Sequence, residues 1–191
     1  RVAICNRKGG TAKSTTAVHL AHGLAKTGRR VLLIDTDAQG NCSPMLGVSP
    51  ETGLADVVDG ADPMSAAIEV RDNLYLLAGG RELAGVTREI SRRDYDAQLV
   101  LSEALKPIDG HFDYAVIDTG PGYSPMSINV LFYASEIVVP ISMETLAVYG
   151  YLEFLGELEP ISKRSGANVR YLLPTMADHR KGLTEDILQQ L

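Results

Sequence analysis

Two lysines and two glycines are gathered with three hydroxyl side chains in the segment NRKGGTAKST, which covers residues 6–15. Glycine lets a backbone approach a bulky anion closely, and lysine supplies positive charge. The segment follows an apolar run and precedes a helical pattern, so backbone N–H groups and the positive end of a helix would face the same anion. These residue types and their order predict a site for phosphate groups.

The segment departs twice from the common phosphate-loop pattern G-x-x-x-x-G-K-[ST]. Arg7 stands where the first glycine is expected, and Ala12 stands where the second is expected. If the backbone at Ala12 needs a positive φ, its Cβ costs on the order of 1 kcal/mol, and otherwise alanine is harmless. The sequence leaves both alternatives open. In this pattern Lys13 reaches the β- and γ-phosphates of a nucleotide, and the Ser14 hydroxyl ligates Mg²⁺.

Carboxylates end two further apolar runs. Asp35 and Asp37 lie in LLIDTDAQGN, and Asp118 lies in YAVIDTGPG. A strand-end carboxylate can hold Mg²⁺, and the ion offsets the repulsion between carboxylate and phosphate. Either run alone would also be compatible with an ordinary turn. The order of the three segments predicts a metal-dependent nucleotide site, with a glycine-rich hinge at residues 120–122 that senses the third phosphate.

The elements that must position these side chains alternate along the chain. Strands are predicted at residues 1–5, 30–35, 73–79, 114–118, 136–141 and 168–173, and helices at residues 14–26, 81–90, 95–105, 125–133, 146–163 and from 184 onward. Apolar runs separated by helices are typical of a parallel sheet that is buried on both faces. The sequence therefore predicts a three-layer α/β domain of the P-loop NTPase type, with ligands beyond the carboxyl ends of the strands. Residues 40–63 are predicted to be a loop.

Length and composition limit the possible functions. We expect the 191 residues to form a single domain that is truncated at both ends, because the chain starts in an apolar run and stops in a helical pattern. The formal charge of −6 argues against a surface covered with nucleic-acid-binding charge. Cys5 and Cys42 match no metal-ligand spacing and no disulfide framework, which suits a reducing cytoplasm. No apolar run approaches the roughly 20 residues that span a bilayer.

The motifs resemble those of a known family. KGGTAKST is similar to the deviant Walker A motif of the ParA/MinD family of ATPases, and DTDAQGN resembles the switch I segment of ParA/Soj-type partition ATPases. The likeness extends over essentially the whole chain, although Gly120 stands where a proline is usual. The resemblance implies that the nucleotide is held by Gly9, Gly10, Thr11, Ala12, Lys13, Ser14 and Thr15, and that Ser14, Asp35 and Asp118 lie at the metal.

The same resemblance assigns roles in catalysis to Lys8, Lys13 and Asp37. It implies that Lys8 reaches across a dimer interface to the nucleotide of the partner subunit, while Lys13 serves the phosphates of its own subunit. Asp37 would help to position the attacking water. With ATP and Mg²⁺ as cofactors, the implied activity is ATP hydrolysis by in-line attack of water, in which most of the catalysis is positioning and charge stabilisation.

The implied biological role is chromosome or plasmid partition, or the positioning of another cargo. The family resemblance implies an ATP-dependent homodimer in the cytoplasm that binds DNA non-specifically at the nucleoid and is stimulated by a ParB-like partner. Residues 161–191 carry five basic and three acidic residues, which could border a DNA contact or form a solvated surface. The alternatives are a MinD-like membrane-associated ATPase, a reductase built like the nitrogenase iron protein, and a nucleotide-binding scaffold with little hydrolysis.

Overall fold

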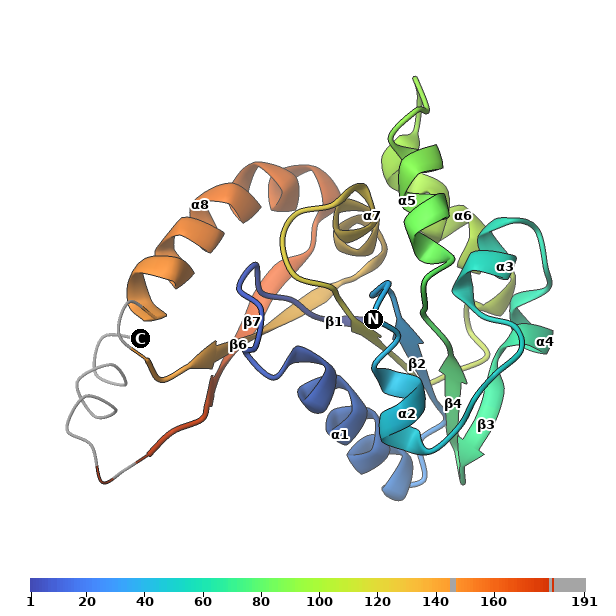
Figure 1. Ribbon diagram of the computed structural model, residues 1–191, viewed down its shortest axis with the longest axis horizontal. Helices are drawn as coiled ribbons and strands as arrows, with labels where there is room; N and C mark the ends of the chain where they lie inside the picture. Colours follow the sequence, from blue (N-terminus) through green and yellow to red (C-terminus); the bar gives the residue numbers. More distant parts are fainter. Residues whose placement is uncertain (145–146, 179, 181–191) are drawn as a thin grey trace.

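The computed structural model describes residues 1–144, 147–178 and 180 of the chain. Its strands form one sheet in the order β3-β4-β2-β5-β1-β6-β7 (Figure 1). The strands are β1 Val2–Ile4, β2 Val31–Asp35, β3 Ile68–Arg71, β4 Leu74–Leu77, β5 Tyr114–Asp118, β6 Glu136–Ser142 and β7 Asn168–Thr175. All neighbouring pairs are parallel except β3 and β4. The predicted α/β fold with a mostly parallel sheet is confirmed.

Helices cover both faces of the sheet. They are α1 Lys13–Lys26, α2 Cys42–Leu46, α3 Leu54–Val58, α4 Pro63–Ala66, α5 Leu83–Ile90, α6 Val100–Leu105, α7 Pro125–Tyr133 and α8 Ala147–Ser165, with short 3₁₀ turns at Ala97–Leu99 and Lys106–Ile108. In Figure 1, α1 and α2 lie on one side of the strands, and α5, α7 and α8 lie on the other. The helix predicted from residue 184 lies outside the described residues. None of the described helices has the length and apolar character needed to cross a bilayer.

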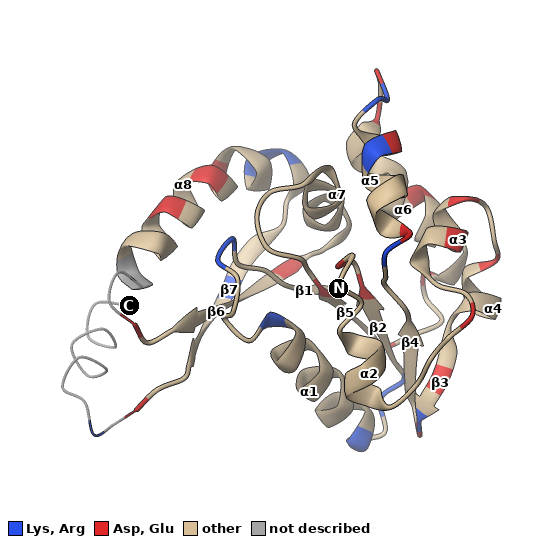
Figure 2. Cartoon of the chain, viewed as in Figure 1, with Lys and Arg blue, Asp and Glu red and all other residues tan. Residues whose placement is uncertain are grey.

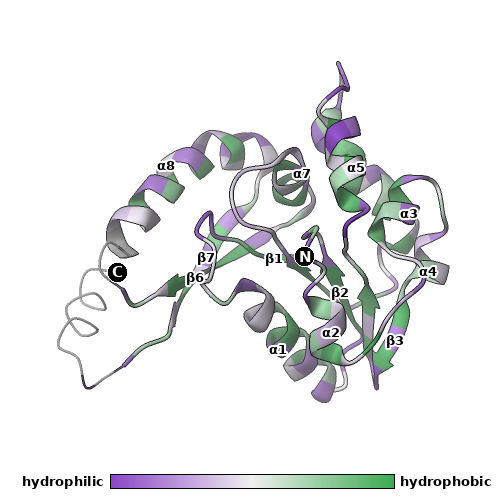
Figure 3. Ribbon diagram, viewed as in Figure 1, coloured by the Kyte–Doolittle hydropathy of each residue, from purple (hydrophilic) through white to green (hydrophobic). Residues whose placement is uncertain are grey.

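The central strands are apolar because they are buried on both faces. All five residues of β2 are buried. Leu32 and Ile34 pack in the cluster that contains α3, α5, α6 and α7, whereas Val31 and Leu33 pack against α1. Successive side chains of a strand point to opposite faces, so a strand between two helical layers needs an unbroken apolar run. Figure 3 shows this hydrophobic colouring along β2 and β4.

Three short helices and one strand occur where the sequence predicts no regular structure. The segment 40–63 contains α2 and α3 and leads into α4, and β3 forms an antiparallel edge strand beside β4. Helices of four or five residues are too short to show a helical period, and tertiary packing decides them. In α3, for example, Leu54 and Val57 are buried in the core. The predicted helix at 95–105 starts later than expected, since α6 begins at Val100 after a 3₁₀ turn.

Candidate functional site

The site is built where three parallel strands end side by side. The register pairs Asp118, the last residue of β5, with Ile4 at the end of β1 and with Asp35 at the end of β2. The segment after β2 is fixed to β5, because the backbone N–H and the hydroxyl of Thr36 both donate to the carbonyl of Asp118, at 3.1 and 2.6 Å. The phosphate-loop segment and the predicted carboxylates therefore share one edge of the sheet.

The backbone of the loop turns into α1 through left-handed residues. Gly10 has φ of 72° and Ala12 has φ of 67°. The carbonyl of Ala12 accepts the N–H of Thr16 at 2.9 Å, which starts the helix. Of the two alternatives left open by the sequence, the structure shows the strained one. The Cβ of Ala12 carries a cost of roughly 1–2 kcal/mol that glycine would not have at this position.

The start of the loop is tied to neighbouring elements. The Asn6 side chain donates its amide to the carbonyl of Pro140 in β6 at 2.7 Å and accepts the N–H of Lys8 at 3.0 Å. The carbonyl of Arg7 accepts the N–H of Gly122 at 2.9 Å, which joins the loop to the hinge after β5. Asn6 is 8% exposed, so its hydrogen bond to Pro140 is shielded from water and helps to fix the path of the backbone.

The two lysines of the loop point to different surroundings. Lys13 is 7% exposed, and its Nζ donates to the carbonyl of Lys8 at 2.9 Å. Burial lowers the pKa of Lys13, an effect that the nearby Asp118 carboxylate opposes. The Nζ of Lys8 instead lies outside the loop, 2.7 Å from Oε2 of Glu144, and both of these side chains are about half exposed. One ammonium group thus lies inside the site and the other lies at its rim.

Arg7 fastens the outer side of the loop to α8. Its guanidinium lies 2.7 Å from Oε1 of Glu157 and 3.2 Å from Oε1 of Glu153. Acidic residues are spaced along α8, on the side of the molecule that carries this loop (Figure 2). Arg7 stands where the common pattern has its first glycine. Because its guanidinium pairs with two glutamates of α8, the side chain lies outside the phosphate site.

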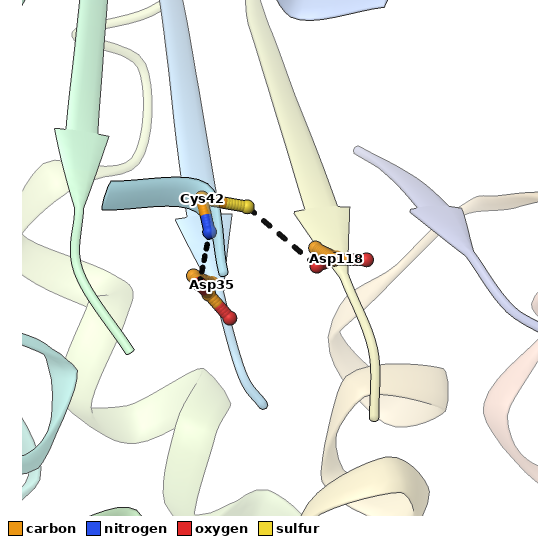
Figure 4. Close-up of side chains that lie close together, drawn as sticks. All are labelled: Asp35, Cys42 and Asp118. Carbon is orange, nitrogen blue, oxygen red and sulfur yellow. Dashed lines mark hydrogen bonds between the residues drawn. The ribbon is translucent and has the colours of Figure 1, made fainter. Parts of the chain in front are cut away.

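Buried carboxylates and a thiol meet behind the loop, as Figure 4 shows. Asp35 and Asp118 are both fully buried. Asp35 accepts the N–H of Asp37 at 2.9 Å on Oδ1 and the N–H of Cys42 at 3.0 Å on Oδ2. The Sγ of Cys42 lies 3.5 Å from Oδ2 of Asp118 and donates to it. Asp37 is partly exposed and lies closer to the opening of the site.

Asp118 has the electrostatics of a cation ligand. Burial raises its pKa to about 7, while the Ser14 hydroxyl opposes this rise and the neighbouring Asp35 carboxylate adds to it. Its Oδ1 is buried and has no hydrogen-bond partner of good geometry among the described residues. A buried carboxylate oxygen without a donor is costly unless a cation occupies the space beside it. The residues present therefore fit a divalent ion between Asp118 and the start of α1.

A cleft of about 450 Å³ opens in front of these groups, and a volume of this size is typical of small-molecule sites. Residues of all three segments line it, among them Gly10, Lys13, Ser14, Asp37 and Thr119. The cleft thus brings together the start of α1, the segment after β2 and the segment after β5.

Comparison with known proteins agrees with this geometry. A family model described as an AAA domain matches residues 1–171. The chromosome-partitioning ATPase Soj of Thermus thermophilus is 37% identical over 195 residues, which cover 100% of this chain and 75% of that protein. The chromosome partitioning protein ParA of Caulobacter vibrioides is 34% identical, with 100% and 74% covered. The chain belongs to the ParA/Soj family of partition ATPases.

A solved structure shares the fold of this ParA/Soj family member. The structure described as cobyrinic acid a,c-diamide synthase from Mycobacterium smegmatis, with bound ATP analog and magnesium, has a TM-score of 0.92 and 32% sequence identity. The match covers 99% of this chain and 80% of that one. The ParA/Soj relatives and the phosphate loop together identify the chain as a P-loop ATPase.

In this ParA/Soj ATPase most of the residues predicted to form the site line the cleft. Gly9, Gly10, Ala12, Lys13, Ser14, Thr15 and Asp37 all line the cleft. Thr11 is 1% exposed and lies under the loop, where its hydroxyl donates to the carbonyl of Lys8 at 3.4 Å. Asp35 and Asp118 lie together behind the cleft, as the parallel strands predict. The predicted residues therefore form one site, and Lys8 lies at its edge.

Two glycines make room for the carboxylates, and sequence reasoning missed one of them. A Cβ on Gly79 would lie 2.7 Å from Oδ1 of Asp35 and 2.7 Å from the carbonyl oxygen of Asp37. A Cβ on Gly120, the position where the family usually has proline, would lie 3.2 Å from Oδ1 of Asp37. Glycine at position 120 therefore lets the Asp37 carboxylate come close to the hinge. The only sequence signal for Gly79 was its place at the end of a predicted strand.

Proposed function

We propose that this ATPase is a nucleotide-dependent dimerising switch for chromosome or plasmid partition or for positioning another cargo. The observation that carries the proposal is the different placement of the two loop lysines. Lys13 is buried beside the cleft, whereas the Lys8 ammonium lies at the rim in a half-exposed ion pair with Glu144. An ammonium group at the rim is available to a second molecule that closes over the cleft, and Lys13 remains for the phosphates of its own subunit.

The nucleotide of this switch is ATP, with Mg²⁺ as its ion, in line with the ATP analog and magnesium of the Mycobacterium smegmatis neighbour. The N–H groups of the loop and the start of α1 face the phosphates, and Lys13 neutralises their charge. Ser14 and the bare Oδ1 of Asp118 would hold the ion, with Asp35 behind them. When bound, Mg²⁺ supplies charge stabilisation at the transferred phosphoryl group.

Asp37 has the position expected of a residue that orients the attacking water. It lies on the cleft side of the buried Asp35, and its Oδ1 accepts the N–H of Gln39 at 3.0 Å, which fixes the carboxylate. Its other oxygen remains available for a water molecule near the third phosphate. Lys8 from the partner subunit would add positive charge at the same phosphate, so hydrolysis would depend on the dimer.

We propose that the ATP-bound dimer binds DNA non-specifically and works at the nucleoid in the cytoplasm. A ParB-like partner would stimulate hydrolysis, which then weakens the dimer. Coupling of this kind requires that ATP bind the dimer more tightly than the monomer. These steps are supported by the membership of the ParA/Soj family and by the placement of Lys8.

The test of the switch is the mass of the protein in solution with ATP, with ADP and without nucleotide, measured by light scattering. We expect a doubling of mass with ATP alone. Lys8→Ala should retain nucleotide binding but lose the doubling, whereas Lys26→Ala, an exposed lysine in the last turn of α1, should behave as wild type. An ATP dimer that persists in the Lys8→Ala protein contradicts the assigned role of Lys8.

Turnover tests the role of Asp37 separately. Asp37→Ala should bind ATP, form the dimer and release phosphate at a strongly reduced rate, because the water loses its orientation. Phosphate release is followed with and without DNA. Unchanged turnover in Asp37→Ala removes this residue from catalysis but leaves the dimerisation proposal intact.

A further inference from the structure

Cys42 is placed among the buried carboxylates of the site, and the nucleotide mechanism makes no use of its thiol. One ligand atom from each of Asp35, Cys42 and Asp118 lies within 4.8 Å of the other two, and all three residues are buried. Cys42 begins α2, so the backbone N–H that it donates to Asp35 and the Sγ that it turns toward Asp118 are fixed by the same short helix (Figure 4). The three residues form a compact O, O, S donor set.

One spacing in this donor set, between Cys42 and Asp118, is the one that a tetrahedral ion requires. Zinc holds a thiolate sulfur at about 2.3 Å and a carboxylate oxygen at about 2.0 Å, so two such ligands at the tetrahedral angle are roughly 3.5 Å apart. The Sγ of Cys42 and Oδ2 of Asp118 are 3.5 Å apart. An ion can therefore bind to these two atoms with little movement of either side chain.

A second observation points to a cation beside the same carboxylate. Oδ1 of Asp118 is buried and has no hydrogen bond of good geometry among the described residues, although the Ser14 hydroxyl lies near this carboxylate, and Oδ2 accepts only a weak thiol donor. An S–H···O hydrogen bond accounts for the 3.5 Å separation but leaves Oδ1 without a hydrogen bond of good geometry among the described residues. A divalent ion at Asp118 would compensate the charge of both Asp35 and Asp118.

We propose that Asp35, Cys42 and Asp118 bind a thiophilic divalent cation of the Zn²⁺ type in the nucleotide-free protein. The thiol is the feature that separates this site from a magnesium site, because Mg²⁺ prefers oxygen ligands and sulfur selects Zn²⁺. On binding, the S–H bond of Cys42 breaks, its proton passes to solvent, and the thiolate forms the bond to the metal. A water molecule would complete the four-coordinate shell.

The ion has a path to the site through the cleft. Ser14, Asn41 and Thr119 line the cleft. Asn41 precedes Cys42, Thr119 follows Asp118, and the Ser14 hydroxyl contacts the Asp118 carboxylate. Asp118 belongs to both the Mg²⁺ site and the cluster. Bound Zn²⁺ should therefore compete with the binding of Mg²⁺ and nucleotide in the same chain.

Titration of the nucleotide-free protein with Co²⁺ tests the proposal, because a thiolate bound to Co²⁺ gives a near-ultraviolet charge-transfer band and tetrahedral Co²⁺ gives strong visible bands. We expect both bands in the wild type, and their loss on addition of Zn²⁺. Cys42→Ala and Cys42→Ser should lose the charge-transfer band and bind Zn²⁺ at least about 100-fold more weakly, since losing even an outer partner of a metal ligand costs roughly 10–100-fold.

The second cysteine of the chain is the matched control. Cys5 directly follows β1, is 5% exposed and packs against α7 and α8. Burial raises its pKa to about 11. Cys5→Ser should therefore keep the wild-type spectrum. Circular dichroism and thermal unfolding show that each variant is folded. Absence of a thiolate band in the wild type, or retention of the same band in folded Cys42→Ala, overturns the proposal.

Discussion

The left-handed conformation of Ala12 predicts that replacing this alanine by glycine raises the free energy of unfolding, which is the opposite of the usual effect. Replacing alanine by glycine normally destabilises a protein, because glycine loses more backbone freedom on folding, a cost of about 0.4–1 kcal/mol. At φ of 67°, however, alanine carries a penalty of roughly 1–2 kcal/mol that glycine does not have. The difference predicts that Ala12→Gly is more stable than the wild type by about 0.5–1 kcal/mol.

The matched control is Ala84→Gly in α5. Ala84 is exposed and helical, so the same chemical change should cost roughly 0.5–1 kcal/mol there. The two variants should differ in their free energies of unfolding by about 1.5 kcal/mol, or by roughly 3–6 °C in Tm for a chain of this size. Urea unfolding followed by circular dichroism measures this difference. Equal destabilisation by both substitutions would refute the strained conformation of Ala12.

Three further predictions concern contacts around the site. Gly79→Ala should lower the free energy of unfolding by about 1–3 kcal/mol and disturb Asp35, because its Cβ would lie 2.7 Å from that carboxylate. Gly85→Ala in α5, where a Cβ meets open space, should be neutral or stabilising. Urea unfolding compares the two variants. Ser124 is the N-cap of α7, and its hydroxyl accepts the N–H of Ser127 at 3.1 Å. Ser124→Ala should lower the free energy of unfolding by about 1 kcal/mol, measured by thermal unfolding. A loss near zero would mean that water replaces the cap. Arg7→Ala should cost less than about 1 kcal/mol and only at low salt, since its ion pairs are partly exposed, and a large salt-independent loss would contradict this.

The sheet and the positions of the carboxylates could be predicted from sequence because burial on both faces leaves a strong pattern. The four residues of β2 before Asp35 are apolar, and β5 ends in the same way at Asp118. Parallel strands place such ends at one edge, so sequence reasoning could bring Asp35, Asp118 and the loop before Lys13 together. The short elements α2, α3 and β3 escaped prediction because their few residues depend on contacts with distant segments.

Side-chain partners in the site could not be predicted, because long loops and strands separate them along the chain. Glu144 pairs with Lys8 across 136 positions of sequence, and Cys42 reaches Asp118 across 76 positions. The spacing of the cysteines matched no metal pattern, since two ligands of the cluster come from strand ends and one from a short helix. The φ of Ala12 was likewise open, because alanine gives no sequence signal for a left-handed backbone.

The ion pair between Lys8 and Glu144 bears on how easily the proposed dimer forms. Before Lys8 can contact a partner nucleotide it must leave Glu144, and both side chains are about half exposed, at 54% and 55%. Exposed pairs of this kind contribute about 0–1 kcal/mol, so breaking this one is a small cost beside the attraction of an ammonium group to a triphosphate. Glu144→Gln should therefore leave ATP-dependent dimerisation within about fivefold of the wild type, whereas Lys8→Ala should abolish it. A dimer strengthened far more than fivefold in Glu144→Gln would instead show that the pair restrains Lys8 in the monomer.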